Sequence, residues 1–440
     1  MSNNLESSLP GMHIFFSGIG GAGIGPATLV AKQAGYDVSG SDAKDSQYVQ
    51  YLRKKGIEDI VIGQTAEQIA TVHKRKPIDL FVYTAALSAD HPELAFCQQN
   101  GIKTAGQYDF INEILSQNNL KLVSIAGTHG KTTTTAMVIW LFKQLDIPIS
   151  YSVGAKLNFG DMGEFDSGAE YFVAESDEFD RRFLVLKPYL SIISGLAWDH
   201  HEIFPTLEDY NQAFRQFISQ SEQTVIWDED AEKLNLLSNA IRVVNSQDPS
   251  IGKIKLIGQF NRRDAYLAMQ AVQLITPSPA DKLVELMNGF PGLSRRFEKV
   301  AENLYSDYAH TPEKIVGLMS VAKEKAAQNN QKIVIVYEPL TNRRMHYLAA
   351  DHQDVFNGAS KIYWVPSYLA REDPNQPVLS PEQLIKNLNP DLQKIASTAK
   401  LDEQLKSVVQ QRLNAGDLVV ALSGGGGGSL DEWLRKNFKA

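Results

Sequence analysis

The ten residues 126–135, Ala-Gly-Thr-His-Gly-Lys-Thr-Thr-Thr-Thr, constrain the fold of this chain more than any other stretch. An apolar run precedes them and the apolar-periodic segment 136–142 follows, which predicts a strand, a glycine turn and a helix. Such a turn directs backbone N–H groups and a helix N-terminus towards one point, which suits a phosphate chain. Because Ile125 stands where the common loop has its first glycine, this is a short form of the loop. An ordinary turn into a helix is the alternative, but the flanking strand and helix favour binding of ATP or GTP.

The side chains of this loop have separate expected roles. Lys131 would place a positive charge on the β- and γ-phosphates, and Thr132 would offer its hydroxyl to Mg2+. The residues predicted to bind ATP here are Gly127, Thr128, His129, Gly130, Lys131, Thr132 and Thr133.

A second glycine cluster follows a strand-like segment near the N-terminus. Gly18, Gly20 and Gly23 fit the dinucleotide fingerprint G-x-G-x-x-G, and Asp42 follows about 20 residues later, where a ribose-binding acid is expected. This pattern predicts a nucleotide-binding Rossmann unit rather than a tight turn that binds nothing. It does not name the ligand, because NAD, FAD and the diphosphate of a UDP-sugar all fit a glycine turn at a helix N-terminus.

Composition restricts the partners and the compartment. The net charge of −8 argues against a nucleic-acid partner, since no basic stripe is present to neutralise phosphates. The single cysteine excludes an intramolecular disulfide and fits a reducing cytosol. Segment 1–10 is polar, which predicts no signal peptide, and no apolar run reaches transmembrane length. We therefore expect a cytoplasmic protein without membrane partners, and the oligomeric state stays open.

Strand-like and helix-like segments alternate throughout the 440 residues, which predicts an α/β fold with parallel sheets covered on both faces. We expect three domains: a Rossmann-like domain over 1–118, a P-loop NTPase-like central domain over 119–293, and a Rossmann-like α/β domain over 294–440. Pro277-Ser-Pro279 is interpreted as a boundary between two helices of the central domain. Residues 84–88 form an expected loop at a strand C-terminus, where α/β sheets bind ligands.

Two further strand-like runs end in residues that can carry chemistry. Residues 171–174 lead into Glu175-Ser-Asp-Glu178, and acids at the end of a strand beside a phosphate loop are where Mg2+ ligands belong. Residues 189–193 lead towards Asp199-His200, which predicts a role for His200 near a metal or phosphate. A solvated acidic turn and a packed histidine are the alternatives, and zinc is disfavoured because no spaced Cys/His set is present. These acids and His200 are therefore candidates to act near a metal or phosphate.

Taken in order, these motifs resemble those of the Mur ligases, the ATP-dependent amide-forming enzymes of peptidoglycan precursor synthesis. The resemblance covers nearly the whole chain. Besides the two glycine loops it rests on Ser39-Gly-Ser-Asp42, Ser88-Ala-Asp90, Glu175-Ser-Asp-Glu178, Asp199-His200, Arg295-Arg-Phe-Glu298 and Asp307-Tyr-Ala-His310. It implies that the N-terminal domain holds a UDP-sugar, the central domain holds ATP and Mg2+, and the C-terminal domain brings the amino acid and closes over the site.

The resemblance also implies a reaction and the residues that serve it. Phosphoryl transfer to the muramoyl carboxylate would give an acyl-phosphate, which an amine then attacks to form an amide, ADP and phosphate. By position, Glu175 and His200 resemble the family's metal-site residues, so the expected metal site comprises Thr132, Glu175 and His200, and the expected catalytic residues are Lys131, Glu175 and His200. Asn261 resembles an adenine contact, and Arg296 and Asp307 resemble residues that reach ATP. The expected UDP-sugar residues are Gly18, Gly20, Gly21, Gly23, Asp42 and Ser88, and the expected amino-acid residues are His310, Arg343 and Arg344.

The chain departs from the family pattern at four positions. Gly195 and Asp264 replace asparagines, while Phe260 and Thr311 replace histidines. The stretch 228–258 is also shorter than usual. These departures concern the adenine pocket more than the phosphate chemistry.

Several functions stay open at the level of sequence. The N-terminal and central parts resemble family members that join L-alanine to UDP-N-acetylmuramate. Glu338-Pro339, followed by Thr341-Asn342 and by the later glycine run Ser423–Gly428, instead leans towards members that attach the recovered tripeptide L-Ala-γ-D-Glu-meso-diaminopimelate. An NAD-dependent oxidoreductase and a non-catalytic nucleotide-gated binding protein are the alternatives from other classes.

Overall fold

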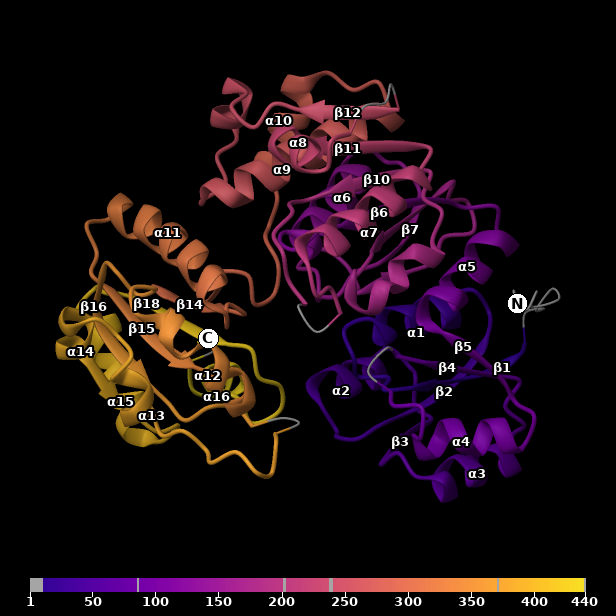
Figure 1. Ribbon diagram of the computed structural model, residues 1–440, viewed down its shortest axis with the longest axis horizontal. Coiled ribbons are helices and arrows are strands. Elements are labelled where there is room, and N and C mark those ends of the chain that lie inside the picture. Colours follow the sequence, from indigo (N-terminus) through magenta and orange to yellow (C-terminus); the bar gives the residue numbers. More distant parts are fainter. Residues whose placement is uncertain (1–10, 85–86, 201–202, 237–239, 370–371, 439–440) are drawn as a thin grey trace. The chain divides into compact units, whose positions relative to one another are not determined.

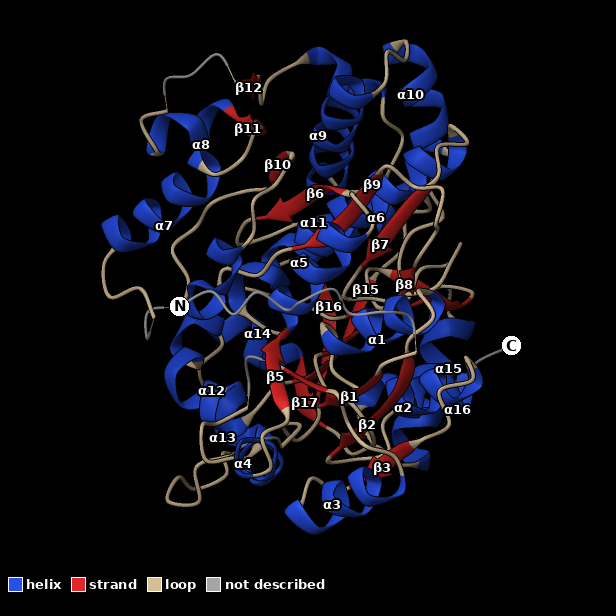
Figure 2. Cartoon of the chain, turned by 90° about the vertical axis from the view of Figure 1, so that its right-hand side faces the viewer, coloured by secondary structure: helices blue, strands red, loops and turns tan. Residues whose placement is uncertain are grey.

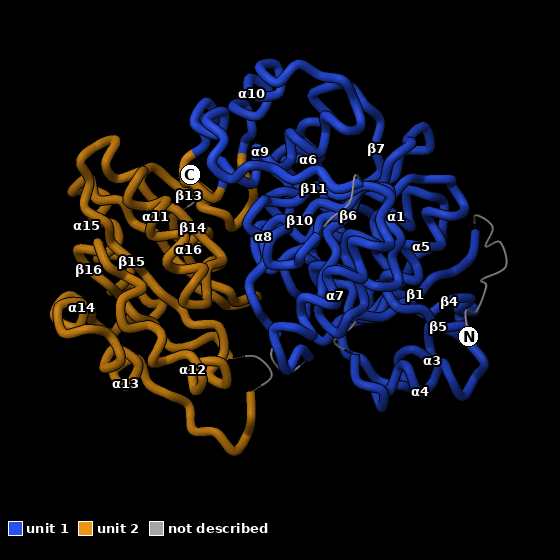
Figure 3. The backbone as a smooth tube through the Cα atoms, turned by 45° about the horizontal axis from the view of Figure 1, so that its top comes forward, with its two compact units in different colours: residues 1–256, 261–291 blue, residues 257–260, 292–440 orange. Residues whose placement is uncertain are grey.

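The computed structural model describes residues 11–84, 87–200, 203–236, 240–369 and 372–438 (Figure 1). The polar segment 1–10, and Ala85-Ala86 of the loop expected over 84–88, lie outside the described residues. The chain divides into two compact units: unit 1 comprises residues 1–256 and 261–291, and unit 2 comprises residues 257–260 and 292–440 (Figure 3).

The first sheet of unit 1 has five parallel strands in the order β3-β2-β1-β4-β5. Its strands are β1 (His13–Ser17), β2 (Asp37–Asp42), β3 (Ile60–Ile62), β4 (Leu80–Tyr83) and β5 (Lys103–Gly106). The connecting helices are α1 (Ile24–Gln33), α2 (Gln47–Lys54), α3 (Ala66–Arg75) and α4 (Pro92–Gln99), and α5 (Gln107–Gln117) follows β5. This strand order, with β1 at the centre and its glycine turn leading into α1, is that of a Rossmann unit, as the sequence predicted.

Alternation along β1 shows why this sheet is buried on both faces. Ile14 and Phe16 join one apolar cluster, whereas Phe15 lies in the other cluster and stacks on Phe81 of β4. Successive side chains of a strand point to opposite faces, so a continuous apolar run fits a sheet with helices on both sides.

The second sheet of unit 1 has seven strands in the order β12-β11-β10-β6-β9-β7-β8, and only the β7/β8 pair is antiparallel. Its strands are β6 (Lys121–Ala126), β7 (Ile149–Ser152), β8 (Gly163–Glu164), β9 (Tyr171–Glu175), β10 (Leu190–Ile193), β11 (Gln223–Trp227) and β12 (Ile241–Val244). Its helices are α6 (Lys131–Gln144), η1 (Phe179–Val185), α7 (Leu207–Ser219), α8 (Asp228–Lys233), η2 (Pro249–Lys253), α9 (Gln259–Ile275) and α10 (Ala280–Asn288). The break between α9 and α10 confirms the helix boundary predicted at Pro277-Ser-Pro279.

Unit 2 contains the third sheet, in the order β13-β14-β18-β15-β16-β17, with only the β13/β14 pair antiparallel. Its strands are β13 (Glu298–Ala301), β14 (Leu304–Asp307), β15 (Ile333–Glu338), β16 (Ala359–Trp364), β17 (Ala396–Thr398) and β18 (Leu418–Ser423). Its helices are α11 (Pro312–Gln328), α12 (Asn342–Leu348), η3 (Ala350–His352), α13 (Pro381–Ile385), α14 (Pro390–Ile395), α15 (Glu403–Asn414) and α16 (Leu430–Phe438). Side chains of β15 alternate between two apolar clusters, so this sheet too is buried on both faces.

The three sheets, with helices between many of their strands, confirm the predicted α/β fold class (Figure 2). Within the part of the chain that the structure describes, no helix is long and apolar enough to cross a membrane.

Candidate active site

The predicted strand, glycine turn and helix are present as β6, residues 127–130 and α6. Gly127 and Gly130 both have positive φ angles, of 137° and 75°. A Cβ atom on Gly127 would lie 2.7 Å from Ser194 Oγ and 2.8 Å from the carbonyl oxygen of Gly195, so only glycine fits there. Gly130 is the N-cap of α6, and no side chain caps this helix. The first backbone N–H groups of α6 can therefore bind an anion.

The turn is held in place by the loop that follows β10. The backbone N–H of Thr128 donates to the carbonyl oxygen of Gly195 at 2.8 Å, and its hydroxyl donates to the carbonyl oxygen of Ala197 at 2.6 Å. The hydroxyl of Tyr210 from α7 contacts the same Thr128 hydroxyl. Gly195 thus supports the phosphate loop through its backbone, although it lacks the family's asparagine side chain.

Lys131 is held by acids that follow β9. Its Nζ donates to Glu178 Oε2 and to the carbonyl oxygen of Gly127, both at 2.7 Å, and lies 3.6 Å from Asp177 Oδ1. Burial disfavours the ammonium ion, but its attraction to Glu178 and Asp177 prevails and holds the pKa of Lys131 above its ordinary value. Lys131 therefore remains charged next to the loop that is predicted to bind phosphates.

The three predicted metal ligands fall into two adjoining groups. The hydroxyl of Thr132 donates to Glu175 Oε1 at 3.0 Å. His200 instead gathers with Asp177 and Glu178, whose ligand atoms all lie within 4.8 Å of one another and of the imidazole. Glu178 is fully buried, and its Oε1 atom has no hydrogen-bond partner among the described residues.

Asp177 and Glu178 are functional candidates that sequence reasoning named only as part of a motif. Their orientation depends on a turn in which the non-glycine residues Asp180 and Arg181 have φ angles of 57° and 55°. His200, across the site, has a φ angle of 54°. Strained backbone of this kind gathers at functional sites, but a linear pattern does not reveal it.

Asp264 lies on the other side of the phosphate loop. A Cβ atom on Gly130 would lie 2.7 Å from Asp264 Oδ1, so this carboxyl group packs directly against the helix cap. Burial raises the pKa of Asp264 well above its ordinary value. The protonated acid, like the asparagine that the family has here, is a neutral group with both a donor and an acceptor.

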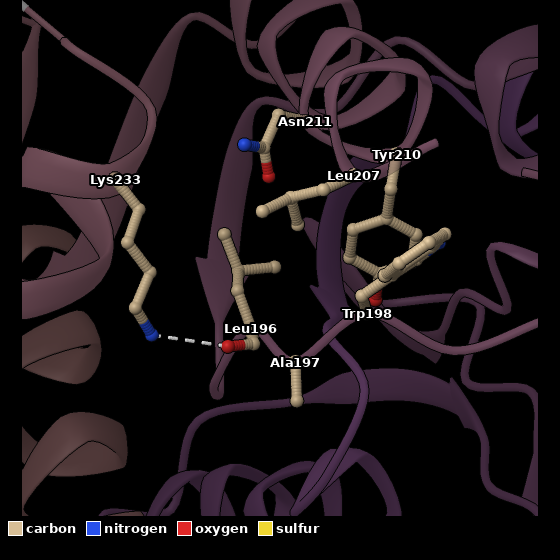
Figure 4. Close-up of a pocket in the computed structure, with 7 residues that line it drawn as sticks. All are labelled: Leu196, Ala197, Trp198, Leu207, Tyr210, Asn211 and Lys233. Atoms are coloured by element: carbon tan, nitrogen blue, oxygen red, sulfur yellow. Dashed lines mark hydrogen bonds between the residues drawn. The ribbon is translucent and has the colours of Figure 1, made fainter. Parts of the chain in front are cut away.

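A small cavity with a volume of about 150 Å³ is lined in part by the loop that follows β10 (Figure 4). Its lining residues are Leu196, Ala197, Trp198, Leu207, Tyr210, Asn211 and Lys233. The ammonium group of Lys233 pairs with Asp230 at 2.7 Å and donates to the carbonyl oxygen of Leu196 at 3.1 Å. Since its one cation is used in this way and its walls are largely apolar, the cavity does not suit a phosphate group.

The N-terminal glycine turn brings most of the predicted UDP-sugar residues together. The N–H groups of Gly18 and Ile19 both donate to the carbonyl oxygen of Ser41 at 2.9 Å. Asp42 closes the turn, because its Oδ2 accepts the N–H of Gly20 at 2.9 Å. Ser88 is exposed, on the segment that follows β4. The carboxylate of Asp42 therefore stabilises the glycine turn, in addition to its predicted contact with a ribose.

In unit 2, the predicted residues at the end of β14 gather around a buried histidine. Burial, together with the positive charges of Lys314, Arg344 and Arg296, lowers the pKa of His310 to about 3. The carboxylate of Asp307 accepts the N–H groups of Phe297 and Ala309, both at 2.7 Å. This part of unit 2 therefore combines a neutral imidazole with several cations, which suits an anionic ligand.

Two other predicted residues have different surroundings. Arg343 is exposed on α12, and its backbone N–H donates to Glu372 at 2.8 Å. Asn261 lies in the first turn of α9, in unit 1.

Comparison with known proteins agrees with this arrangement. Residues 13–118 match the model of the Mur ligase family catalytic domain, and residues 125–253 match that of the Mur ligase middle domain. The UDP-N-acetylmuramate–L-alanine ligase of Clostridium beijerinckii is 30% identical, with 94% of this chain and 95% of that protein covered.

Solved structures show the same fold over most of the chain. The UDP-N-acetylmuramate–alanine ligase MurC of Thermotoga maritima has a TM-score of 0.76 at 24% identity, covering 94% of this chain and 96% of that one. The murein peptide ligase of Psychrobacter arcticus has a TM-score of 0.65 at 21% identity, with the same shares covered.

Proposed function

The chain belongs to the Mur ligase family, and from this premise we propose that it joins L-alanine to UDP-N-acetylmuramate in an ATP-dependent reaction. The observation that carries the proposal is the phosphate loop, with Lys131 held between Glu178 and Asp177 at its mouth. Because the chain belongs to this family, we reject the NAD-dependent oxidoreductase, which the glycine fingerprint had left open. We assign the UDP-sugar to residues 1–118, ATP to 119–293 and the amino acid to 294–440.

The chemistry follows from the weakness of a carboxylate as an acyl donor. A carboxylate oxygen of the muramoyl group attacks the γ-phosphorus, and the bond to the β-phosphate oxygen breaks to release ADP. The amine nitrogen then attacks the acyl carbon, phosphate leaves and the amine loses a proton. Two anions must meet in the first step, so Lys131 and the N–H groups at the start of α6 act on the transferring phosphoryl group.

The acid cluster fits Mg2+ as the cofactor of the phosphoryl transfer. Carboxylate oxygens, the preferred ligands of Mg2+, converge from Asp177 and Glu178 beside His200, and Glu178 offers a buried oxygen that has no hydrogen-bond partner in the described part of the chain. Thr132 and Glu175 lie together at the end of β9 and would complete the set. When bound, Mg2+ would neutralise phosphate oxygens as charge moves onto the leaving ADP.

Within unit 2, the tripeptide alternative rests on Glu338, which stands where the L-alanine ligases have glutamine. Its carboxylate is buried, accepts the hydroxyl of Ser423 at 2.6 Å, and accepts the N–H of Leu430 at 3.1 Å. Since both oxygens serve internal contacts, Glu338 supports the glycine loop between β18 and α16 and gives no argument for a peptide substrate. L-Alanine is therefore preferred, because more of the chain resembles the enzymes that use it.

Phosphate release with UDP-N-acetylmuramate and each amine in turn tests the proposal. We expect release that requires ATP, Mg2+, the UDP-sugar and L-alanine together, with a product of the mass of UDP-N-acetylmuramoyl-L-alanine. Turnover with L-Ala-γ-D-Glu-meso-diaminopimelate and none with L-alanine would establish the recycling reaction instead. No amine-dependent turnover with either would reject the ligase assignment.

A further inference from the structure

The first turn of α5 contacts both candidate sites of unit 1. This helix packs against α1, β4 and β5 of the first sheet and against η1, which follows the acids of the second sheet (Figure 1). At its first residue, the side chain of Gln107 fills the space beside Gly23, where a Cβ atom would lie 2.4 Å from Gln107 Oε1. A ligand bound at the glycine turn must therefore fit beside this amide group.

The next residue reaches the acid loop, which we define as residues 175–178. The hydroxyl of Tyr108 accepts the backbone N–H of Asp177 at 2.6 Å, joining positions 69 residues apart. Asp177 and its neighbour Glu178 in turn hold the ammonium group of Lys131. The backbone of the acids that face the phosphate loop is thus anchored by a hydrogen bond that Asp177 donates to α5.

These contacts form one connected path. Because Gln107 and Tyr108 are adjacent in the first turn of α5, a displacement of Gln107 would move Tyr108, whose hydroxyl holds the backbone N–H of Asp177. We infer that Tyr108 is a positioning residue that couples occupancy of the N-terminal glycine turn to the geometry of the acid loop and hence to nucleotide binding. This inference rests on the proposed function, because it takes the glycine turn as the UDP-sugar site.

A second tyrosine provides a matched control. The hydroxyl of Tyr51 from α2 donates to Asp161 Oδ1 at 2.7 Å, and so also joins the first part of unit 1 to the second. Asp161 lies outside the acid loop and makes no contact with Lys131 among the described residues. If any tyrosine bridge between these parts were sufficient, loss of either hydroxyl would have the same effect.

The test is a binding cycle on the full chain with the variants Tyr108→Phe and Tyr51→Phe. Calorimetry gives the dissociation constant of Mg-ADP with and without saturating UDP-N-acetylmuramate. We expect the sugar nucleotide to change this constant by roughly fivefold or more in the unmodified protein, as is usual for coupled sites. The ratio should fall to within about twofold of one in Tyr108→Phe and stay unchanged in Tyr51→Phe, while kcat falls roughly 2- to 10-fold only in Tyr108→Phe.

Gln107→Ala supplies an independent variant if Tyr108→Phe does not fold. It removes the contact at Gly23 and leaves the hydrogen bond from the N–H of Asp177 to the Tyr108 hydroxyl in place, so the coupling measured at saturating UDP-N-acetylmuramate should fall in this variant too. Unchanged coupling in a folded Tyr108→Phe protein, equal loss in Tyr51→Phe, or absence of coupling in the unmodified protein would overturn the inference. Failure of the proposed function is distinct, because the unmodified protein would then form no amide at all.

Discussion

Lys131 illustrates how one side chain serves both stability and chemistry. It is 15% exposed, and its partner Glu178 is 1% exposed, so the ion pair is largely removed from water. Removing one partner of such a pair leaves an uncompensated buried charge and costs about 3 kcal/mol or more. Under the proposed function, phosphate oxygens of ATP would offer Lys131 an alternative partner, so nucleotide binding would exchange one ion pair for another.

For Lys131→Ala we expect turnover to fall on the order of 100-fold or more, because a preorganised charge at the transferring phosphoryl group is lost. Lys143→Ala, at the other end of α6, should keep near-parental activity, since Lys143 pairs with Glu164 away from the loop. The double variant Lys131→Ala/Glu178→Gln should regain stability in urea unfolding but not activity. Near-parental turnover in a folded Lys131→Ala protein would reject the phosphate-loop assignment.

Substitution of Asp264, unlike that of Lys131, is expected to stabilise the folded protein. Because burial raises its pKa, ionisation of Asp264 disfavours the folded state, and stability falls as pH rises through the pKa of the folded form. Asp264→Asn should therefore raise the melting temperature at pH 8, where an aspartate of the unfolded chain is ionised.

Asp248→Asn is the control for this experiment. Hydrogen bonds from Ser250 and Tyr266 lower the pKa of Asp248, so removal of its charge should not stabilise the fold. A lower melting temperature for Asp264→Asn at pH 8 would contradict the account of Asp264.

At the level of elements, Glu338 joins the end of β15 to β18 and to the start of α16. Burial raises the pKa of Glu338 to about 7, and the hydrogen bond from Ser423 opposes this rise only in part. Between the unfolded value near 4.5 and this folded value, the folded protein binds more protons, so stability falls as pH rises. The full effect is about 3 kcal/mol and persists above pH 7.

Glu338→Gln should therefore weaken the loss of stability between pH 5 and pH 8, since glutamine keeps an acceptor for Leu430 and a donor for Ser423. Urea unfolding at the two pH values measures this change. Glu338→Ala, which loses both hydrogen bonds, should be less stable than Glu338→Gln throughout. Equal pH dependence in Glu338→Gln and the unmodified protein would show that Glu338 does not titrate in this range.

The local sequence predicted the presence of helices and strands better than the residues at which they begin. The strand predicted over 13–17 is confirmed as β1, because its apolar residues are contiguous and bounded by a glycine turn. The apolar-periodic segment 136–142 lies within α6, which already begins at Lys131, directly after the glycine turn. Threonines lower intrinsic helix propensity, but the glycine cap and the packing of α6 prevail over that preference.

The candidate site was predictable only in part for a related reason. Thr132 and Glu175 lie on adjoining elements, and the structure joins them directly. The partnership of Lys131 with Glu178 depends on the turn through Asp180 and Arg181, which no periodicity specifies. Likewise, the contact from Tyr108 to Asp177 spans two sheets and has no local signature.

On the scale of the whole molecule, two compact units carry the predicted ligand residues, and each has its own apolar cores. The residues predicted to bind the UDP-sugar all lie in unit 1, whereas those predicted to bind ATP include Arg296 and Asp307 of unit 2. Units with separate cores unfold separately unless strongly coupled, so calorimetry should resolve two transitions. Glu338→Ala, which weakens only unit 2, identifies the transition of that unit.

UDP-N-acetylmuramate at about 100 times its dissociation constant should then stabilise the transition of unit 1 by about 2.7 kcal/mol and leave that of unit 2 in place. A non-hydrolysable ATP analogue with Mg2+ should raise both transitions, because its predicted contacts lie in both units. Arg296→Ala should abolish the shift of unit 2 and keep that of unit 1. If the ATP analogue raises only the transition of unit 1 in the unmodified protein, the assignment of Arg296 and Asp307 to ATP is wrong, while the phosphate loop retains its role.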